Sequence, residues 1–332
     1  MATTFWSNGL HSPPPPCNSH RHVNRPIKVL LQTTIPPTAD DWSIARFSLL
    51  ARSLREERGA DGLPLFEVTA RDRDPPGVAD SVLSTLDQSD FDQLWLFAVD
   101  VGDGLTAEDC RAISNFHRLG HGLMVTRDHM DLGCSICALD GVGAAHHFHT
   151  KNVDPNAPHK RDDPYTTSIS WPNFHSGANG DYQKIQIHAP LHPVLSDSSS
   201  PTGAIRFLPS HPHEGDVSAP PASGARVIAS GTSRATGAAF NIAVAFEARG
   251  GRGRAMAQST FHHFTDYNWD TRSGAPSFVS EPPGDAILRE PEALAETRRY
   301  VRNVALWLGG RDPCGSKTWQ LHSNQSRGGA VA

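Results

Sequence analysis

The sequence predicts an α/β protein of three layers, in which helices cover both faces of a mostly parallel sheet. Three observations support this fold class. In the first half of the chain, short apolar runs alternate with segments of helical periodicity, as in repeated β-α-β units. The runs are nearly continuous, which is typical of strands that are buried on both faces. The run at residues 123–126 is followed at once by charged and imidazole side chains, as expected at the carboxyl end of a sheet strand.

The first half supplies four strands with helices between them. Strands are expected, in chain order, at residues 28–32, 66–69, 94–99 and 123–126. Asp40 or Asp41 is placed to cap the helix that follows the first strand, and a short helix is expected at residues 81–86. Before the fourth strand, Thr106 and Asp109 have the spacing of a capping box, with Asp in place of the usual Glu or Gln.

The second half of the chain is less regular. Residues 150–183 are polar and rich in Pro, Asn and Gly, and so long a segment without periodicity is more often a functional insertion than a plain linker. Further strands are expected at residues 184–187, 204–207, 226–230, 241–246 and 255–260. Pro291 opens a closing helix. We therefore expect a disordered leader at residues 1–26, a single domain at 27–310 and a disordered tail at 311–332.

Composition excludes several classes of function. The net charge of −5 and the lack of a basic stripe argue against a nucleic-acid partner. No apolar run is long enough to span a membrane, and no secretory signal is visible, so the cytoplasm is the default location. Five cysteines do not suggest a disulfide framework, and the lone pair Cys134 and Cys137 is interpreted as two small helix residues. A small-molecule substrate is the expected partner, and the sequence leaves a homo-oligomer open.

Histidine is unusually frequent, with 18 copies in 332 residues. It is the commonest metal ligand and the side chain that acts as acid and base near neutral pH. A single histidine is ordinarily a surface or loop residue, but here many are grouped. The groups are His146, His147 and His149; His188 and His192; His211 and His213; and His262 and His263.

The stretch from residue 122 to residue 149 is where a site is expected. Arg127, Asp128 and His129 directly follow its apolar strand, while Thr33 and Asp100 follow two earlier strands. Open α/β sheets bind ligands at the carboxyl ends of their strands, where these side chains would meet. The sequence therefore predicts the position of a site more firmly than its chemistry.

Five segments occur in an order that resembles a known family. They are KVLLQTT at 28–34, HAPLHPVL at 188–195, HPHEG at 211–215, RVIAS at 226–230 and GGRGRAMAQSTFHH at 250–263. In this order they resemble the ThuA-like (trehalose utilisation) family of the class I glutamine-amidotransferase-like superfamily, over about residues 27–309. The resemblance implies a flavodoxin-like sheet and a role in carbohydrate metabolism.

The chain departs from the family pattern at the site itself. The family's terminal Gly-His is replaced by Phe261, His262 and His263, so either histidine could be the counterpart. The histidine usual after the fourth strand is met by the segment at 127–129, and the leader and the 150–183 insertion have no counterpart. Amidotransferases of this superfamily use a cysteine after a central strand, but residues 126–129 contain none. Glutamine hydrolysis is therefore disfavoured, and so is a serine hydrolase, because no G-x-S-x-G motif occurs.

Carboxylate and imidazole chemistry is what remains. The candidate catalytic residues are Asp128, His129, His262 and His263. The candidate substrate-binding residues are Thr33, Asp100, Arg127, Glu214 and Trp269. The candidate metal ligands are His129, His211, His213 and His263. Neighbouring residues of a strand point to opposite faces, so we expect only one of His262 and His263 in the site.

Two functions fit these residues. The first is a ThuA-like enzyme with hydrolytic or lyase-type chemistry on a carbohydrate or related polar small molecule. Its His/Asp site can hold one divalent metal, such as Zn, Fe, Ni or Mn, or can act without metal as general acid and base. The alternative is a non-catalytic binding or scaffold module. A scaffold would not need ionisable groups gathered at strand ends, where burial disfavours their charge.

Overall fold

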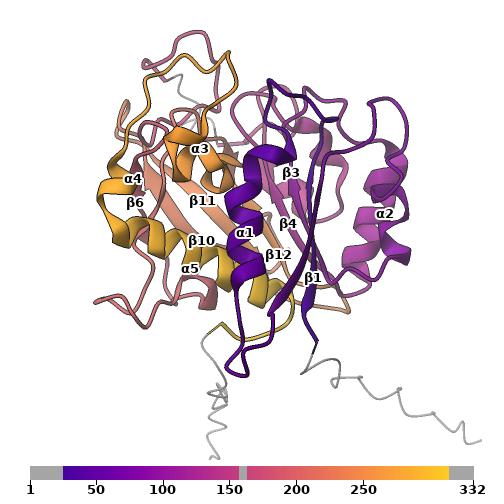
Figure 1. Ribbon diagram of the computed structural model, residues 1–332. Coiled ribbons are helices and arrows are strands. Elements are labelled where there is room, and N and C mark those ends of the chain that lie inside the picture. Colours follow the sequence, from indigo (N-terminus) through magenta and orange to yellow (C-terminus); the bar gives the residue numbers. More distant parts are fainter. Residues whose placement is uncertain (1–24, 157–162, 314–332) are drawn as a thin grey trace, which may run out of the picture.

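The computed structural model describes residues 25–156 and 163–313, and an eight-stranded mixed sheet forms its centre (Figure 1). The strand order is β2-β1-β3-β4-β12-β11-β10-β7. The first five of these strands are parallel, and they are β2 (Phe66–Arg71), β1 (Ile27–Thr33), β3 (Gln93–Phe97), β4 (Gly122–Thr126) and β12 (Ala255–Gln258). The other three pair antiparallel, and they are β11 (Ala239–Phe246), β10 (Ala225–Thr232) and β7 (Gln186–Ile187).

The parallel part has the strand order of a flavodoxin-like sheet. Beginning at one edge, β2, β1, β3 and β4 are followed by a fifth parallel strand, β12, which comes much later in the chain. The order 2-1-3-4-5 with parallel strands is the flavodoxin-like arrangement. The predicted α/β class with a mostly parallel sheet is therefore confirmed, and the antiparallel strands extend it at the β12 side.

Helices cover both faces of the sheet (Figure 1). On one face lie α1 (Ser48–Glu56) and α5 (Pro291–Leu308), and on the other lie α2 (Ala107–Arg118) and the 3-10 turns η2 (Leu83–Gln88), η3 (Cys134–Ala138) and η4 (Val142–Ala145). Side chains of β3 alternate between the two layers. Trp95 and Phe97 pack on the α1 and α5 side, while Leu94 and Leu96 pack on the α2 side.

Most helix ends agree with the sequence. The capping box of α2 is present, because the Asp109 backbone N–H donates to Thr106 Oγ1 at 3.2 Å and the Thr106 backbone N–H donates to the Asp109 carboxylate at 2.9 Å. The closing helix begins at Pro291, as predicted. The short helix expected at 81–86 is the 3-10 turn η2.

The expected cap of the first helix was wrong. The chain first forms a 3-10 turn, η1 (Ile44–Phe47), and α1 begins only at Ser48. Its first backbone N–H groups, at Ser48 and Leu49, donate to the carboxylate of Asp266 at 3.1 and 2.7 Å. Asp266 opens the distant helix α3 (Asp266–Trp269), so a tertiary contact supplies the cap that local spacing assigned to Asp40 or Asp41.

The remaining elements are short. They are the strands β5 (His146–His147), β6 (Tyr182–Lys184), β8 (Phe207–Pro209) and β9 (Asp216–Val217), the turns η6 (Pro193–Leu195), η7 (His262–Phe264) and η8 (Thr271–Ser273), and the helix α4 (Ala286–Arg289). The strand expected at 255–260 ends at Gln258, and both histidines after it lie in η7 rather than in a strand. Of the predicted leader and tail, only residues 25–26 and 311–313 lie within the described residues. No helix in the described ranges combines the length and the hydropathy needed to cross a membrane.

Candidate functional site

A cavity of about 360 Å³ lies at the carboxyl edge of the parallel strands. Its walls come from the segments that follow four neighbouring strands. Trp42 follows β1, Val99 follows β3, Asp128 follows β4 and Phe261 follows β12. This is the edge at which open α/β sheets bind their ligands, and the sequence predicted it from the residues that follow β4.

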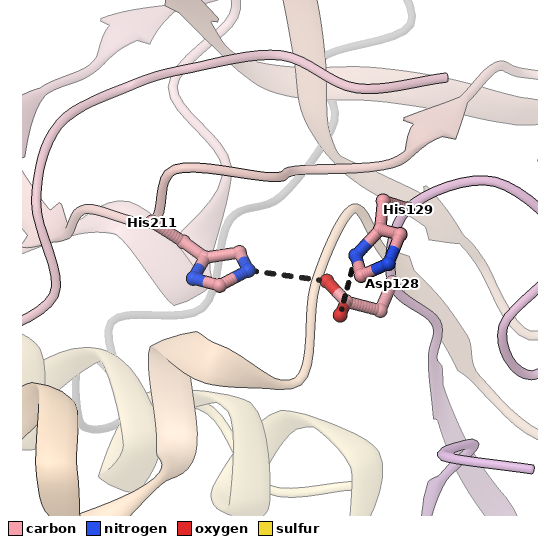
Figure 2. A group of neighbouring side chains, drawn as sticks. All are labelled: Asp128, His129 and His211. Atoms are coloured by element: carbon pink, nitrogen blue, oxygen red, sulfur yellow. Dashed lines mark ion pairs between the residues drawn. The ribbon is translucent and has the colours of Figure 1, made fainter. Parts of the chain in front are cut away.

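Asp128 is the centre of the polar part of this cavity. Its carboxylate lies 3.1 Å from His129 Nδ1 and 3.4 Å from His211 Nε2, so that it sits between two imidazoles (Figure 2). His262 Nε2 is 3.7 Å away, and the Thr260 hydroxyl donates to Asp128 Oδ1 at 3.2 Å. Asp128, His211 and His262 are buried, whereas His129 is partly exposed to the cavity. Three histidines from different loops thus converge on one carboxylate.

A chain of amide groups fixes which ring nitrogen carries the proton in two of these histidines. The Asn268 amide donates to the Ser210 carbonyl at 2.7 Å, which turns its oxygen toward His262 Nδ1 at 3.2 Å. The same amide donates to Asn179 Oδ1 at 3.0 Å, and that oxygen faces His211 Nδ1 at 2.9 Å. Because an amide oxygen only accepts, both Nδ1 atoms must be the N–H donors. The Nε2 atom of each ring therefore faces Asp128 with a lone pair, unless the ring carries a second proton.

His213 is held in the same way. The Asn173 amide donates to the Ile169 carbonyl at 3.1 Å, so its oxygen accepts from His213 Nδ1 at 2.9 Å. His213 Nε2 lies 2.9 Å from Glu281 Oε1. Burial lowers the pKa of His213, yet both of its ring nitrogens face oxygen acceptors. The 2.9 Å contact is of hydrogen-bond length, so a proton lies between Nε2 of this histidine and the Glu281 carboxylate.

The charge states of the central pair follow from their surroundings. Burial opposes ionisation of Asp128, but the neighbouring His129 and His211 outweigh it and hold its pKa well below the ordinary value. Burial, with a smaller contribution from His262, holds the pKa of His211 well below its ordinary value. His211 favours the Asp128 carboxylate only while a proton lies on the ring nitrogen that faces it. A lone pair that faces a carboxylate is unfavourable unless a cation or a proton lies between them.

This donor set suits a divalent metal ion. Asp128, His129 and His211 each offer a ligand atom, and these atoms all lie within 4.8 Å of one another. Ligand atoms of a tetrahedral centre with bonds of about 2.0–2.1 Å lie about 3.4 Å apart. The observed separations from the carboxylate are 3.1 and 3.4 Å. Metal-bound histidines also usually donate their other N–H to a fixed acceptor, as His211 does to Asn179.

The structure separates His263 and Glu214 from this cavity. Glu214 is buried, and its carboxylate accepts from the Ser176 hydroxyl at 2.5 Å, from the Gln183 amide and from the Ser259 hydroxyl at 2.7 Å. His263 Nε2 lies 3.4 Å from the same carboxylate. Neither residue lines the cavity, although both were candidates from the sequence.

Four other sequence candidates also lie outside the cavity. Arg127 is fully buried, and its guanidinium donates to the carbonyls of His147 and Met130 and lies over the ring of Phe148. The Thr33 hydroxyl donates to Asp72 at 2.6 Å, and the Asp100 carboxylate accepts from the Ser135 hydroxyl at 2.9 Å. Trp269 is a core residue whose indole N–H donates to the His263 carbonyl at 2.9 Å. The contacts of these four residues stabilise the surrounding loops and core and do not reach the cavity.

Sequence reasoning missed several residues of the site. Asn173 and Asn179 lie in the described part of the 150–183 insertion, whose length and polarity were the only signal for a functional role. Asn268 and Glu281 lie in segments without any recognisable pattern. Trp42, whose ring packs edge-on against His262 at 4.6 Å between centroids, was assigned only to a helix face.

Two other places in the described structure do not show this arrangement. His147, Asp154 and Asp216 lie within metal-binding distance of one another, but His147 uses both ring nitrogens, with the Asn152 carbonyl at 2.8 Å and the Ser218 hydroxyl at 2.6 Å. A larger cavity of about 720 Å³ lies at the opposite edge of the sheet. Among its lining residues, Arg25 and Arg252 are ion-paired, and no group of imidazoles converges there.

Comparison with known proteins gives likenesses in structure only. No protein-family model and no curated protein matches the sequence. A ThuA-like protein from Parabacteroides merdae is similar at 14% identity, over 87% of this chain and 92% of that one, with a TM-score of 0.46. One from Bacteroides uniformis is similar at 9% identity, over 89% and 98%, with a TM-score of 0.42. The carbohydrate deacetylase Agd3 is similar at 14% identity, over 70% of this chain and 29% of that one, with a TM-score of 0.35. At these TM-scores, the solved structures carry no functional conclusion.

Proposed function

We propose that this protein is a hydrolase that binds one divalent transition-metal ion at Asp128, His129 and His211 and hydrolyses a small polar molecule in the adjoining cavity. One observation carries the proposal. His211 Nε2 faces the Asp128 carboxylate at 3.4 Å while its Nδ1 proton is fixed on Asn179. A metal ion between the two atoms would turn this unfavourable contact into two coordinate bonds.

The donor set also suggests the kind of metal site. Catalytic zinc sites usually have three protein ligands and leave a fourth position for water or substrate. Two imidazoles and one carboxylate suit Zn, Fe, Ni or Mn. His129 is the most exposed of the three ligands, with 20% of its side chain accessible, so the fourth position would face the cavity. His262 lies behind His211, with its ring stacked 3.5 Å away, and would support that ligand.

The residues of the chain would then divide the work of hydrolysis. A divalent ion held by Asp128, His129 and His211 would supply an acidified water molecule and would polarise a carbonyl of the substrate. Asp128 and the two imidazoles orient that position, and the fixed Nδ1 proton of His211 keeps its Nε2 lone pair available. The proton shared by His213 Nε2 and Glu281 Oε1 is within the cavity wall, where it can pass to the leaving group. A carbohydrate or related molecule is the substrate that the ThuA-like resemblance suggests.

The test measures metal content and hydrolysis together. Protein purified without a histidine tag is analysed for metals before and after chelation, and hydrolysis of 4-nitrophenyl acetate is followed as Zn²⁺ or Mn²⁺ is returned. We expect about one equivalent of metal, with loss of both metal and turnover in His129→Ala. His188→Ala is the matched control, because His188 contacts Ser230 on β10, next to the edge strand β7, and is not among the residues that line the cavity. Protein that stays metal-free when metal is offered, or a His129→Ala variant that keeps its metal, would refute the proposal and favour a binding scaffold.

A further inference from the structure

The outer wall of the cavity is apolar even where it is exposed to solvent. Val101, which follows β3, is 79% exposed, and Phe278, in the segment between α3 and α4, is 59% exposed. Both line the cavity, together with the partly buried Leu132, Ile169 and Val279. Large exposed apolar side chains around an opening often mark a surface that a ligand covers.

The segment that carries Phe278 is fixed in place rather than free. The backbone N–H of Ser277 donates to the Asp40 carboxylate at 2.7 Å, and the Ser277 hydroxyl donates to the same carboxylate. Three residues after Phe278, Glu281 is bound to His213 at 2.9 Å. Because both flanks are anchored, the apolar wall is formed before any ligand arrives, which lowers the entropy lost on binding.

Apart from the proposed metal position, the described residues of the cavity wall offer no Lys or Arg to a negatively charged substituent. The wall adds the carboxylates of Asp41 and Glu281 to that of Asp128. The guanidinium of Arg46, near Asp41, is committed to the carbonyls of Asp41, Gly274 and Ala39. Sites that recognise phosphate or carboxylate groups usually present Arg or Lys to them. An anionic group away from the metal position would meet only repulsion and desolvation.

The volume limits the size of the ligand. At about 360 Å³, the cavity is near the lower end of the range of about 300–1,000 Å³ that is typical of small-molecule sites. It therefore suits one ring with a short substituent and excludes a long polymer from full enclosure.

From the apolar outer wall, the lack of Lys or Arg among the described lining residues and the volume, we infer which polar molecule the proposed hydrolase accepts. It is an ester or amide of single-ring size, without negative charge, that also carries an apolar acyl or aryl group. This inference rests on the proposed hydrolase function. The apolar group would lie against Val101 and Phe278, and the carbonyl would reach Asp128 and its histidines. Water adds to the carbonyl carbon and gives up a proton, and the bond from that carbon to the alcohol oxygen or amine nitrogen breaks. The leaving atom takes the proton that lies between His213 and Glu281, and the proton lost by the water restores this pair.

A matched pair of esters tests the charge preference during turnover. In 4-nitrophenyl butyrate and mono-4-nitrophenyl succinate, a terminal methyl group is exchanged for a carboxylate at nearly constant size. We expect kcat/KM of the metal-loaded protein to be about 10- to 100-fold higher for the butyrate. Val101→Lys places a positive charge at an exposed position without a catalytic role. It should lower the ratio of kcat/KM for the butyrate to that for the succinate several-fold. Phe278→Ala should raise KM for the butyrate and leave the succinate little changed.

A binding experiment on the metal-free protein separates this inference from the hydrolase proposal. Saturation-transfer NMR compares benzamide with benzoate, which differ in charge but hardly in shape. We expect benzamide to bind at least about tenfold more tightly, and Phe278→Ala to weaken it. Equal binding of benzoate would overturn the inference even if the protein hydrolyses esters. A clear preference for benzamide without any metal-dependent hydrolysis would support the inferred ligand class and refute the proposed reaction.

Discussion

Two buried carboxylates with histidine partners lie near the carboxyl edge of the sheet, and they differ in what surrounds them. Glu214 accepts hydrogen bonds from Ser176, Gln183 and Ser259, besides its contact with His263. Asp128 has a single hydroxyl donor, Thr260, and otherwise faces imidazole nitrogens at 3.1–3.7 Å. Only Asp128 borders the cavity.

The number of hydrogen-bond donors around a buried carboxylate helps to distinguish a structural carboxylate from a functional one. Nearly all buried polar atoms in folded proteins have hydrogen-bond partners, so a carboxylate left with few donors calls for a ligand that completes it. Glu214 is complete within the chain, and we assign it to stability. Asp128 has few donors, and we propose that a metal ion completes it.

The largest effect is expected on metal affinity. Asp128→Asn removes the charge and one ligand atom, so it should weaken metal binding by more than the roughly 10- to 100-fold loss that is typical of supporting residues. Glu214→Gln should leave the dissociation constant within about a factor of two, because Glu214 lies outside the ligand set. Titration calorimetry with Zn²⁺ on both variants measures this, and equal losses in the two would remove the distinction.

The next effect is expected on stability, where Glu214 should matter more than Asp128. Glu214→Ala leaves the Ser176, Gln183 and Ser259 donors buried without an acceptor, so it should lower the free energy of unfolding by about 3 kcal/mol. Asp128→Ala in the metal-free protein should lower it by about 1 kcal/mol or less, since a site shaped for a ligand is not optimised for stability. Urea unfolding compares them, and the reverse order would contradict the assignment.

A third buried carboxylate extends the contrast to pH. Burial opposes ionisation of Asp80, but Arg71 and three backbone N–H groups lower its pKa to about 2 from the ordinary 3.8. A depressed pKa stabilises the fold above the unfolded value, and the contribution is lost as pH falls from about 4 toward 2. The free energy of unfolding of the wild type should therefore exceed that of Asp80→Asn by about 2 kcal/mol at pH 7, and this difference should shrink below pH 4. A gap in urea unfolding that stays constant down to pH 2 would be incompatible with this account.

The smallest effect concerns the amide that positions His211. Asn179→Ala removes the acceptor that holds the His211 Nδ1 proton, so metal affinity should fall about tenfold. Asn115→Ala is the matched control, because Asn115 lies on α2 and its amide contacts Asp87 away from the cavity. Affinity that is unchanged in Asn179→Ala would mean that the amide chain does not orient the ligand.

Much of the fold could be predicted because it depends on local pattern. Continuous apolar runs identified the parallel strands, and the spacing of Thr106 and Asp109 identified the start of α2. The cap of α1 could not be predicted, since Asp266 is more than 200 residues away in the chain. The place of β12 between β4 and β11 likewise depends on pairing between segments distant in sequence.

The position of the candidate site could be predicted from the sequence, but only some of its residues could. The edge of the sheet, Asp128, His129 and the pair His211 and His213 followed from residue types after strands. The roles of His262 and His263 could not be separated in advance, because both lie in a 3-10 turn rather than in the expected strand. The His262 ring lies near Asp128, and the His263 ring lies near Glu214. The amide groups that fix the histidine tautomers leave no pattern in a single sequence.

The most direct test of the central claim is X-ray diffraction from crystals grown with Zn²⁺, recorded on both sides of the zinc absorption edge. The account predicts one strong anomalous peak at about 2.0–2.2 Å from an oxygen of Asp128 and from ring nitrogens of His129 and His211. A map without a peak there, or with zinc bound only at surface histidines, would contradict the metal site and with it the proposed hydrolase.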